Sequence, residues 1–129
     1  MAFQILFEID ATGHEPEATL ERHLEKSEFS SDTHKFAKEL VEGVLVNEKA
    51  IDQEIMRAAP HWPLDQMSKV DKNILRIALF EVLFHNKAPL KAVINEAVEL
   101  AKIFGSDNSA RFVNGVLGSI STGERAPSP

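Results

Sequence analysis

The chain carries apolar residues at helical spacing over almost its whole length, and the alternating pattern of a strand is scarce. The opening residues, MAFQILFEIDA, place apolar side chains on two sides of a helix, which is typical of an element packed between others. A turn follows at Gly13, and Pro16 stands where prolines commonly begin a helix. The pattern therefore predicts a short buried helix and then a charged helix over residues 16–28.

Two more helices are expected before PHWPLDQ, the loop at residues 60–66 in which two prolines bracket the single Trp. The serines and the aspartate at 30–32 offer an N-cap for the first of them. Its apolar stripe begins at Phe36 and breaks at Asn47. A separate helix is then expected around Ile51, and it ends before the loop.

The strongest helical pattern begins at Ser68, which fits an N-cap, and continues as KVDKNILRIALFEVLFHN. Between residues 74 and 84 this segment is apolar on nearly all sides, as in the central helix of a bundle. Two further helices are expected over residues 89–104 and 108–120, and Gly105 ends the first of them as a C′ residue would.

Together these elements predict an all-α fold, a compact bundle of about seven helices in two helical subdomains. We expect a single domain over residues 1–120, with an N-terminal half at about 1–59 and a C-terminal half at about 60–120. Residues 121–129 are polar and contain proline, so we expect a disordered tail there.

The amino-acid composition excludes several kinds of site and of protein. The sequence has no Cys, which removes disulfides, thiolate metal sites and cysteine nucleophiles together. Its apolar N-terminal stretch is short and lacks a basic region, so it is not a signal peptide. No stretch approaches the roughly 18 apolar residues of a membrane span. We expect a cytoplasmic protein without a membrane partner.

Enzyme motifs are absent from the sequence. It has no phosphate-binding GKS or GKT loop, no GxGxxG after a strand, no HExxH and no GxSxG. The His residues lie far apart on different predicted elements, so we expect no metal site, no catalytic residues and no cofactor. Glu81 stands among the apolar residues of the strongest helix, where a carboxylate needs a base or an opening to solvent.

From the charge distribution, we expect a polyanionic partner to bind the C-terminal half of the chain. The net charge of −6 argues against nucleic-acid binding by bulk charge alone. Acidic residues outnumber basic ones about twofold up to Pro60, and the two are nearly balanced afterwards. In this second half, Lys69, Lys72 and Arg76 share one face of the strongest helix. Their anionic partner is either acidic surface of the same protein or phosphate, and the pattern alone does not decide.

The last predicted helix contains two poor helix formers, Asn114 and Gly115, away from its apolar face. Phe112 lies at the margin of that face. It is either the rim of the core or an aromatic on which an unpaired base stacks, worth ~1–3 kcal/mol per base. A position at the core rim does not explain Gly115, which leaves backbone open to the close approach of another helix or a nucleotide.

Several segments resemble the NusB family of transcription antitermination factors: VDKNILRIALFEVLF, PLKAVINEAVELAKIFG, S-x-x-FVNGVLG, AFQILFEID and the F-x-x-x-L-V-x-G-V run at 36–44. The resemblance covers nearly the whole chain and implies an all-helical fold of two subdomains without enzymatic activity. It also implies binding of boxA-type RNA from ribosomal operon leaders together with NusE, a small-subunit ribosomal protein. Such a complex joins an elongating RNA polymerase with other Nus factors and suppresses early termination.

The basic face and the resemblance together give the predicted RNA contacts, which are Phe7, Lys69, Lys72, Arg76, Asn108 and Phe112. The resemblance implies contact with NusE for Asp71, Lys72 and Arg76, in the family's V-[DE]-[KR]-x-[IV]-L-R-I-A motif. Two departures from the family pattern stand out. Members usually begin with an Arg-rich segment, whereas this chain starts at MAF, and Asn108 and Gly118 stand where acidic residues are common.

We therefore predict a non-catalytic, RNA-binding antitermination factor. The alternative is a protein–protein interaction module or a homodimer that uses the same surface without RNA.

Overall fold

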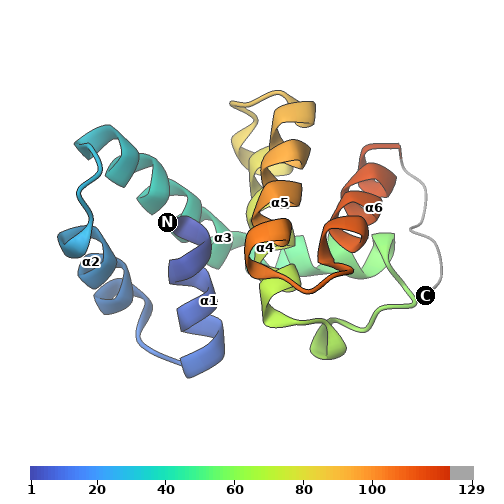
Figure 1. The fold of residues 1–129 in the computed structure, drawn as a ribbon, viewed down its shortest axis with the longest axis horizontal. Coiled ribbons are helices and arrows are strands. Elements are labelled where there is room, and N and C mark those ends of the chain that lie inside the picture. Colours follow the sequence, from blue (N-terminus) through green and yellow to red (C-terminus); the bar gives the residue numbers. More distant parts are fainter. Residues whose placement is uncertain (123–129) are drawn as a thin grey trace.

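The computed structural model describes residues 1–122, which consist of helices and loops without a strand (Figure 1). Six α-helices follow one another along this range: α1 (Ala2–Thr12), α2 (Pro16–Lys26), α3 (Ser31–Ala58), α4 (Lys69–Phe80), α5 (Leu90–Phe104) and α6 (Ser109–Thr122). A 3-10 turn, Leu64–Gln66, precedes α4, and a π-helical turn, Glu81–His85, continues it. The predicted all-α fold is confirmed, and the predicted count of about seven helices is one too high. The predicted tail at 121–129 begins within α6, and the rest of it lies outside the described residues.

The miscount arises at Asn47, where a break was expected and α3 continues without interruption. The side-chain amide of Asn47 donates a hydrogen bond of 2.8 Å to the carbonyl oxygen of Gly43, one turn earlier. Asn ends a helix when its side chain bonds to a backbone in a turn conformation. Here it bonds to the helix itself, and Val44 and Ile51 on either side of it are buried in the same core.

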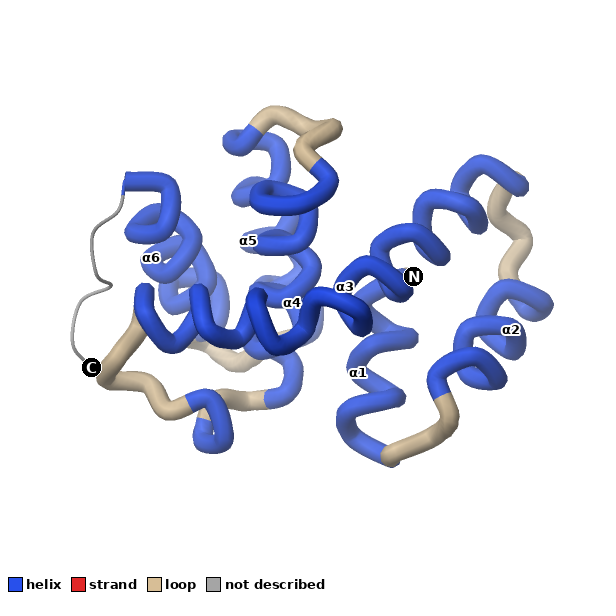
Figure 2. The backbone as a smooth tube through the Cα atoms, turned by 180° about the vertical axis from the view of Figure 1, so that it is seen from behind, coloured by secondary structure: helices blue, strands red, loops and turns tan. Residues whose placement is uncertain are grey.

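Helix α3 connects the two predicted halves. Figure 2 shows it crossing the molecule from the side of α2 to the side of α6, and it contacts α1, α2, α4 and α6. Its end at Ala58 coincides with the boundary expected at residues 59–60. The hydrophobic core nevertheless continues across that boundary and takes buried side chains from all six helices, including Leu6, Leu20, Val41, Leu75, Val93 and Val116.

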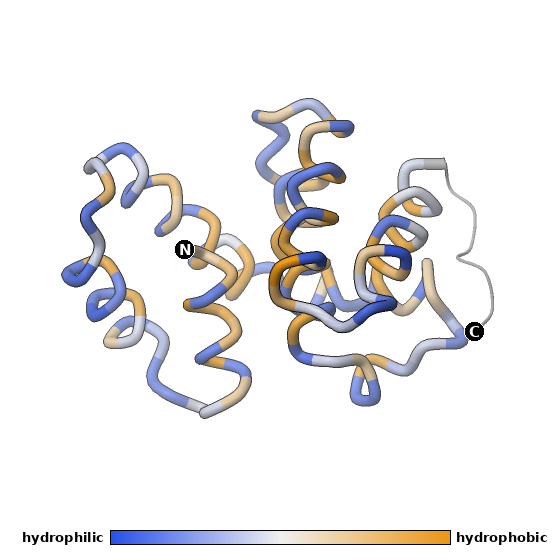
Figure 3. Tube along the Cα trace, in the orientation of Figure 1, coloured by the Kyte–Doolittle hydropathy of each residue, from blue (hydrophilic) through white to orange (hydrophobic). Residues whose placement is uncertain are grey.

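Helix α4 is the central element, as its apolar pattern predicts. Residues 73–80 are all buried, and Figure 3 shows apolar residues concentrated on α4 and α5 in the middle of the molecule. The expected N-cap is also present, because the Ser68 hydroxyl accepts a 3.0 Å hydrogen bond from the backbone N–H of Asp71. Substituting such a cap by Ala costs ~1 kcal/mol.

A glycine allows α3 and α4 to approach each other closely. A Cβ atom on Gly43 would lie 2.1 Å from Cζ of Phe80, and real Cβ contacts are never that short. Phe80 is itself buried, so its ring has little room to move aside. The crossing of α3 and α4 therefore depends on the absence of a side chain at Gly43.

Gly105 ends α5 as predicted, but for a different reason from the left-handed conformation that C′ glycines usually adopt. Its backbone is extended, with φ −94° and ψ −173°. A Cβ atom on Gly105 would lie 2.4 Å from Cβ of Ser109, whose hydroxyl accepts a 2.9 Å hydrogen bond from the N–H of Ser106. Space for the tight connection between α5 and α6 requires the glycine here.

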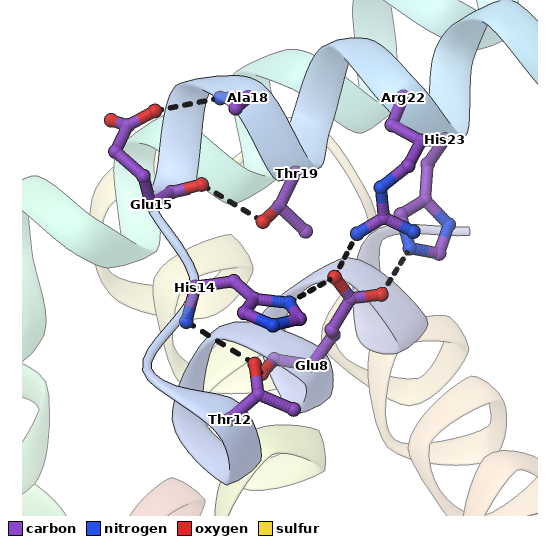
Figure 4. A network of polar contacts seen from close by, with 8 residues as sticks. All are labelled: Glu8, Thr12, His14, Glu15, Ala18, Thr19, Arg22 and His23. Carbon is purple, nitrogen blue, oxygen red and sulfur yellow. Dashed lines mark hydrogen bonds and ion pairs between the residues drawn. The ribbon is translucent and has the colours of Figure 1, made fainter.

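Glu8 joins α1 to α2 and to the turn between them (Figure 4). Its carboxylate accepts hydrogen bonds from His14 Nδ1 at 3.0 Å and from His23 Nε2 at 3.1 Å, and it also pairs with Arg22. These bonds, led by the one from His14, lower the pKa of Glu8 to about 2. The N-terminal pair of helices is thus held by one carboxylate with three partners.

Candidate nucleic-acid and partner interface

The start of α4 places two lysines beside one carboxylate of α1. Lys72 Nζ lies 3.1 Å from Oδ2 of Asp10, and Lys69 Nζ lies 3.9 Å from its Oδ1. Asn73, buried between the helices, donates a 3.1 Å hydrogen bond to Oδ2 of the same aspartate. Partial burial raises the pKa of Asp10, but the hydrogen bonds from Lys72 and Asn73 and the lysine charges outweigh it, and the pKa falls below its usual value. Two ammonium groups thus share the carboxylate of Asp10 at this end of α4.

Arg76 points elsewhere, toward α3. Its guanidinium donates two hydrogen bonds of 2.8 Å to the carboxylate of Asp52 and lies 2.9 Å from Oε1 of Glu48. Burial lowers the pKa of Arg76, but the paired carboxylates outweigh it and raise the pKa. With 8 % of its side chain exposed, Arg76 offers no open guanidinium to phosphate or to a partner protein. The sequence left two anionic partners open for Arg76, acidic side chains of the same protein or phosphate. In the structure, its partners are the carboxylates of Asp52 and Glu48.

A row of aromatic side chains leads along α1 to the lysine cluster. The ring of Phe3 lies 5.9 Å from that of Phe7 and 4.9 Å from that of Phe104 at the end of α5. Phe3, Phe7 and Asp10 are at i, i+4 and i+7, so they share one face of α1. Phe3 is buried, Phe7 is half-buried and Phe104 is 41 % exposed. Phe7 thus lies one turn of α1 before Asp10, the carboxylate that pairs with Lys69 and Lys72, whereas Phe3 and Phe104 lie one turn farther away.

A second aromatic contact joins the proline-bracketed loop to α6. The rings of Trp62 and Phe112 are 4.8 Å apart and tilted by 58°, and both residues are half-buried. Asn108 is exposed immediately before α6, and its carbonyl accepts a 3.0 Å hydrogen bond from the N–H of Phe112. Arg111, beside Phe112, is exposed and forms no ion pair with any residue in the described range. The structure thus places an unpaired cation and a half-open aromatic ring in the first turns of α6.

Sequence reasoning missed three residues of this surface. Arg111 carried a usable signal, since it is a basic residue next to an aromatic on the polar side of a helix. Phe104 is 41 % exposed although its ring contacts the buried Phe3. No spacing rule links Trp62 to Phe112, because they are far apart in the sequence.

Asp71 has an unsatisfied carboxylate oxygen. Its backbone N–H is used by the Ser68 cap, but its Oδ1 is buried and has no hydrogen-bond partner in the part of the chain that the structure describes. A buried polar atom without a partner costs about 1–3 kcal/mol.

The structure shows whether Gly115 is needed for close packing of α6 against another helix. A Cβ atom there would meet no atom of the described residues within 4 Å. Close helix packing within the chain therefore does not require this glycine. The outer face of α6 carries it beside Arg111 and Asn114, which are both exposed.

The predicted site residues fall into three groups. Phe7, Lys69 and Lys72 gather along α1 and the start of α4, Asn108 and Phe112 lie at the start of α6, and Arg76 is internal. Within residues 1–122, no helix is long and apolar enough to cross a bilayer, and no three side chains are arranged to hold a metal ion. The fold defines an all-helical protein, and these residues form its candidate interaction surface.

The chain belongs to the NusB family, whose model matches residues 1–122. It is 54 % identical over 122 residues to the transcription antitermination protein NusB of Roseiflexus castenholzii, an alignment that spans 93 % of this chain and 86 % of the relative. The recognised family and its all-helical fold are thereby confirmed.

Solved structures of NusB proteins have the same fold as this chain. NusB of T. maritima superimposes with a TM-score of 0.87 at 35 % identity, covering 98 % of this chain and 88 % of that one. A NusB chain in a crystal structure of the antitermination factors NusB and NusE in complex with dsRNA has a TM-score of 0.86 at 28 % identity. That match covers 95 % of this chain and 91 % of the other.

Proposed function

We propose that this NusB-family protein acts in the cytoplasm as an RNA-binding antitermination factor without catalysis. It binds boxA-type leader RNA of ribosomal RNA operons together with NusE, and the complex supports elongation by RNA polymerase with other Nus factors. Support comes from the family, from the relative that was solved with NusE and dsRNA, and from the surface described above. The observation that carries the proposal is the half-buried Phe7 one turn of α1 before Asp10, the carboxylate that pairs with both Lys69 and Lys72.

The RNA is proposed to contact both groups of exposed site residues. Lys69 and Lys72 lie next to a single carboxylate, so phosphate oxygens can compete for their ammonium groups. Phe7 and Phe112 are half-buried, which holds each ring in place and leaves part of it open for a base. Asn108 supplies an exposed amide that both donates and accepts hydrogen bonds.

We add Arg111 and Trp62 to the proposed RNA surface, and we no longer include Arg76 among its direct contacts. Arg111 adds an unpaired cation next to Phe112, and Trp62 supports the Phe112 ring from the loop side. Arg76 acts indirectly, since its ion pairs with α3 fix the helix that presents the lysines.

NusE is proposed to dock at the start of α4. Asp71 and Lys72 are half-buried there, and the ammonium group of Lys72 shares the carboxylate of Asp10 with Lys69. Because the net charge of the chain is −6, we expect weak RNA binding by the protein alone and tighter binding when NusE adds its own contacts.

A transcription assay tests the proposed function. RNA polymerase, NusE and the other Nus factors transcribe a template with a boxA leader ahead of a terminator, with and without this protein. We expect increased readthrough that disappears when the boxA sequence is scrambled. Readthrough that is unchanged by the protein, or that is equal on both templates, would overturn the proposal.

A second candidate function is a protein-interaction module or homodimer without RNA. The observation in its favour is the apolar end of α5, where Ile103 is 69 % and Phe104 is 41 % exposed. Sedimentation over a range of concentrations decides this alternative. A stable dimer that boxA RNA does not dissociate supports it, and a monomer that binds RNA rejects it.

A further inference from the structure

Asp10, near the end of α1, pairs with the ammonium groups of two lysines at the start of α4. Its carboxylate lies 3.1 Å from Nζ of Lys72 and 3.9 Å from Nζ of Lys69. The two lysines differ in their access to solvent, since the side chain of Lys69 is 49 % exposed and that of Lys72 is 12 % exposed. Lys69 is thus open to an anion from outside, whereas Lys72 is enclosed and its ammonium group is already paired with Asp10.

The carboxylate of Asp10 makes the contact with Lys72 that a phosphate group would make. An ammonium group binds either anion through charge-assisted hydrogen bonds of the same kind. A phosphate that reaches Lys72 therefore has to displace Asp10, and if both anions stay beside the lysine they repel each other. In either case the carboxylate lowers the RNA affinity that the lysines provide.

We infer that Asp10 is an internal competitor of RNA, which holds the position of a backbone phosphate on Lys72 in the free protein and so limits the affinity of the proposed RNA surface. The inference rests on the proposed function, because that function places RNA on Lys69 and Lys72. Phosphate groups are the same in every RNA sequence, so Asp10 limits the binding of boxA RNA and of other RNA by the same factor. Its role is in affinity and not in sequence preference.

The other polar groups around Asp10 keep partners without its charge. Asn73, which donates to Asp10, also donates a 2.8 Å hydrogen bond to the carbonyl oxygen of Lys69. Arg76 pairs with two carboxylates of α3, one of which, Glu48, lines the same small cleft as Asp10. Asparagine at position 10 offers a carbonyl oxygen to Asn73, so D10N removes the charge and retains the shape and this hydrogen bond.

RNA affinities of matched variants test the inference. The unmodified protein, D10N and D32N are titrated with boxA RNA and with a scrambled RNA of equal length, each with NusE present. We expect D10N to bind both RNAs roughly fivefold more tightly, the scale of one ion pair, and to leave the ratio of the two affinities unchanged. D32N removes the same charge from an exposed residue in the first turn of α3, so it should change either affinity by less than about twofold.

Two further measurements separate competition from an effect on the fold. In a K72Q background there is no ammonium group at that position to release, so D10N should gain less than about twofold in affinity. The second measurement uses the unmodified protein. Burial raises the pKa of Asp10, and in the free protein the hydrogen bonds from Lys72 and Asn73 outweigh burial. RNA that takes over the lysines should therefore raise this pKa, which the carboxyl carbon signal of Asp10 reports in NMR spectra over a range of pH.

Three results would each overturn the inference: D10N that binds RNA no more tightly than the unmodified protein, a gain that persists in full in the K72Q background, or a pKa of Asp10 that RNA leaves unchanged. Failure of the proposed function looks different, because the unmodified protein then binds boxA and scrambled RNA equally. The D10N comparison still decides the inference in that case, since both RNAs carry the same phosphates. An unmodified protein that binds neither RNA would overturn both.

Discussion

Arg76 and Asp52 form a two-point ion pair that joins the middle of α4 to α3, with both hydrogen bonds at 2.8 Å. Glu48 of α3 completes the pair, with its Oε1 2.9 Å from the guanidinium. A basic residue that the sequence offered as an RNA contact is thus used to hold the helix from which its lysine neighbours project.

Removing the guanidinium should destabilise the fold. Because R76A leaves Asp52 without its partner in a mostly buried site, we expect a loss of about 3 kcal/mol in the free energy of unfolding. Urea denaturation measures this loss. R57A, which removes an exposed arginine paired with Glu54, should cost less than about 1 kcal/mol. Similar losses for the two variants would show that the Arg76 pair has no special structural role.

The Phe112 ring should carry a measurable share of RNA affinity. We expect F112A to weaken boxA binding by about 1–3 kcal/mol, as the loss of one stacked base does. Trp62 lies 4.8 Å from this ring and is the only Trp, so its fluorescence reports both the substitution and RNA binding. F29A removes an aromatic ring that is 63 % exposed in the connection between α2 and α3, and it should leave the affinity unchanged.

The cations of the proposed RNA surface should determine the salt dependence of RNA binding. Each of K69Q, K72Q and R111Q should lower the slope of log affinity against log salt by about 0.7, the value for one phosphate contact on a single strand. Binding is measured at several salt concentrations with NusE present. K38Q, on the exposed side of α3, should leave the slope unaffected. If R76Q lowers the slope as much as K72Q does, the assignment of Arg76 to an internal pair is wrong.

Two glycines should respond to alanine in opposite directions. G43A drives a methyl group into the buried Phe80 ring, so despite better helix propensity we expect a net loss of about 1 kcal/mol. G115A meets open space and should stabilise the helix by up to about 1 kcal/mol. Thermal and urea unfolding of both variants checks the signs. A gain for G43A would contradict the close contact between α3 and α4.

The Glu8 cluster should make stability depend on acid pH. The folded-state pKa of Glu8 is about 2, below its ordinary value of 4.5, so its stabilising effect is complete above about pH 4.5 and is lost as the pH falls toward 2. E8Q should therefore be less stable than the unmodified protein at pH 6, and the difference should shrink on acidification. Urea unfolding at several pH values measures both curves, and parallel curves would contradict the role of Glu8.

Local patterns predicted the fold well, and pairs distant in sequence marked the limit of prediction. The apolar run of α4 and the Ser68 cap depend on neighbours within a few residues, so periodicity and capping rules were sufficient. The helix break predicted at Asn47 was wrong, because an Asn side chain that can end a helix can also donate to the preceding turn of the same helix. Arg76 and Asp52 are 24 residues apart on different helices, and no spacing rule indicates that they meet. The same holds for the contact of Trp62 with Phe112 and for the space that surrounds Gly115.

The central claim is that boxA-type RNA is recognised together with NusE. The most direct measurement is the affinity of the protein for boxA RNA and for a scrambled RNA of equal length, each with and without NusE, at one salt concentration. The account predicts weak binding of both RNAs by the protein alone and, with NusE, clearly tighter binding of boxA than of the scrambled RNA. Equal affinity for the two RNAs in the presence of NusE would contradict it.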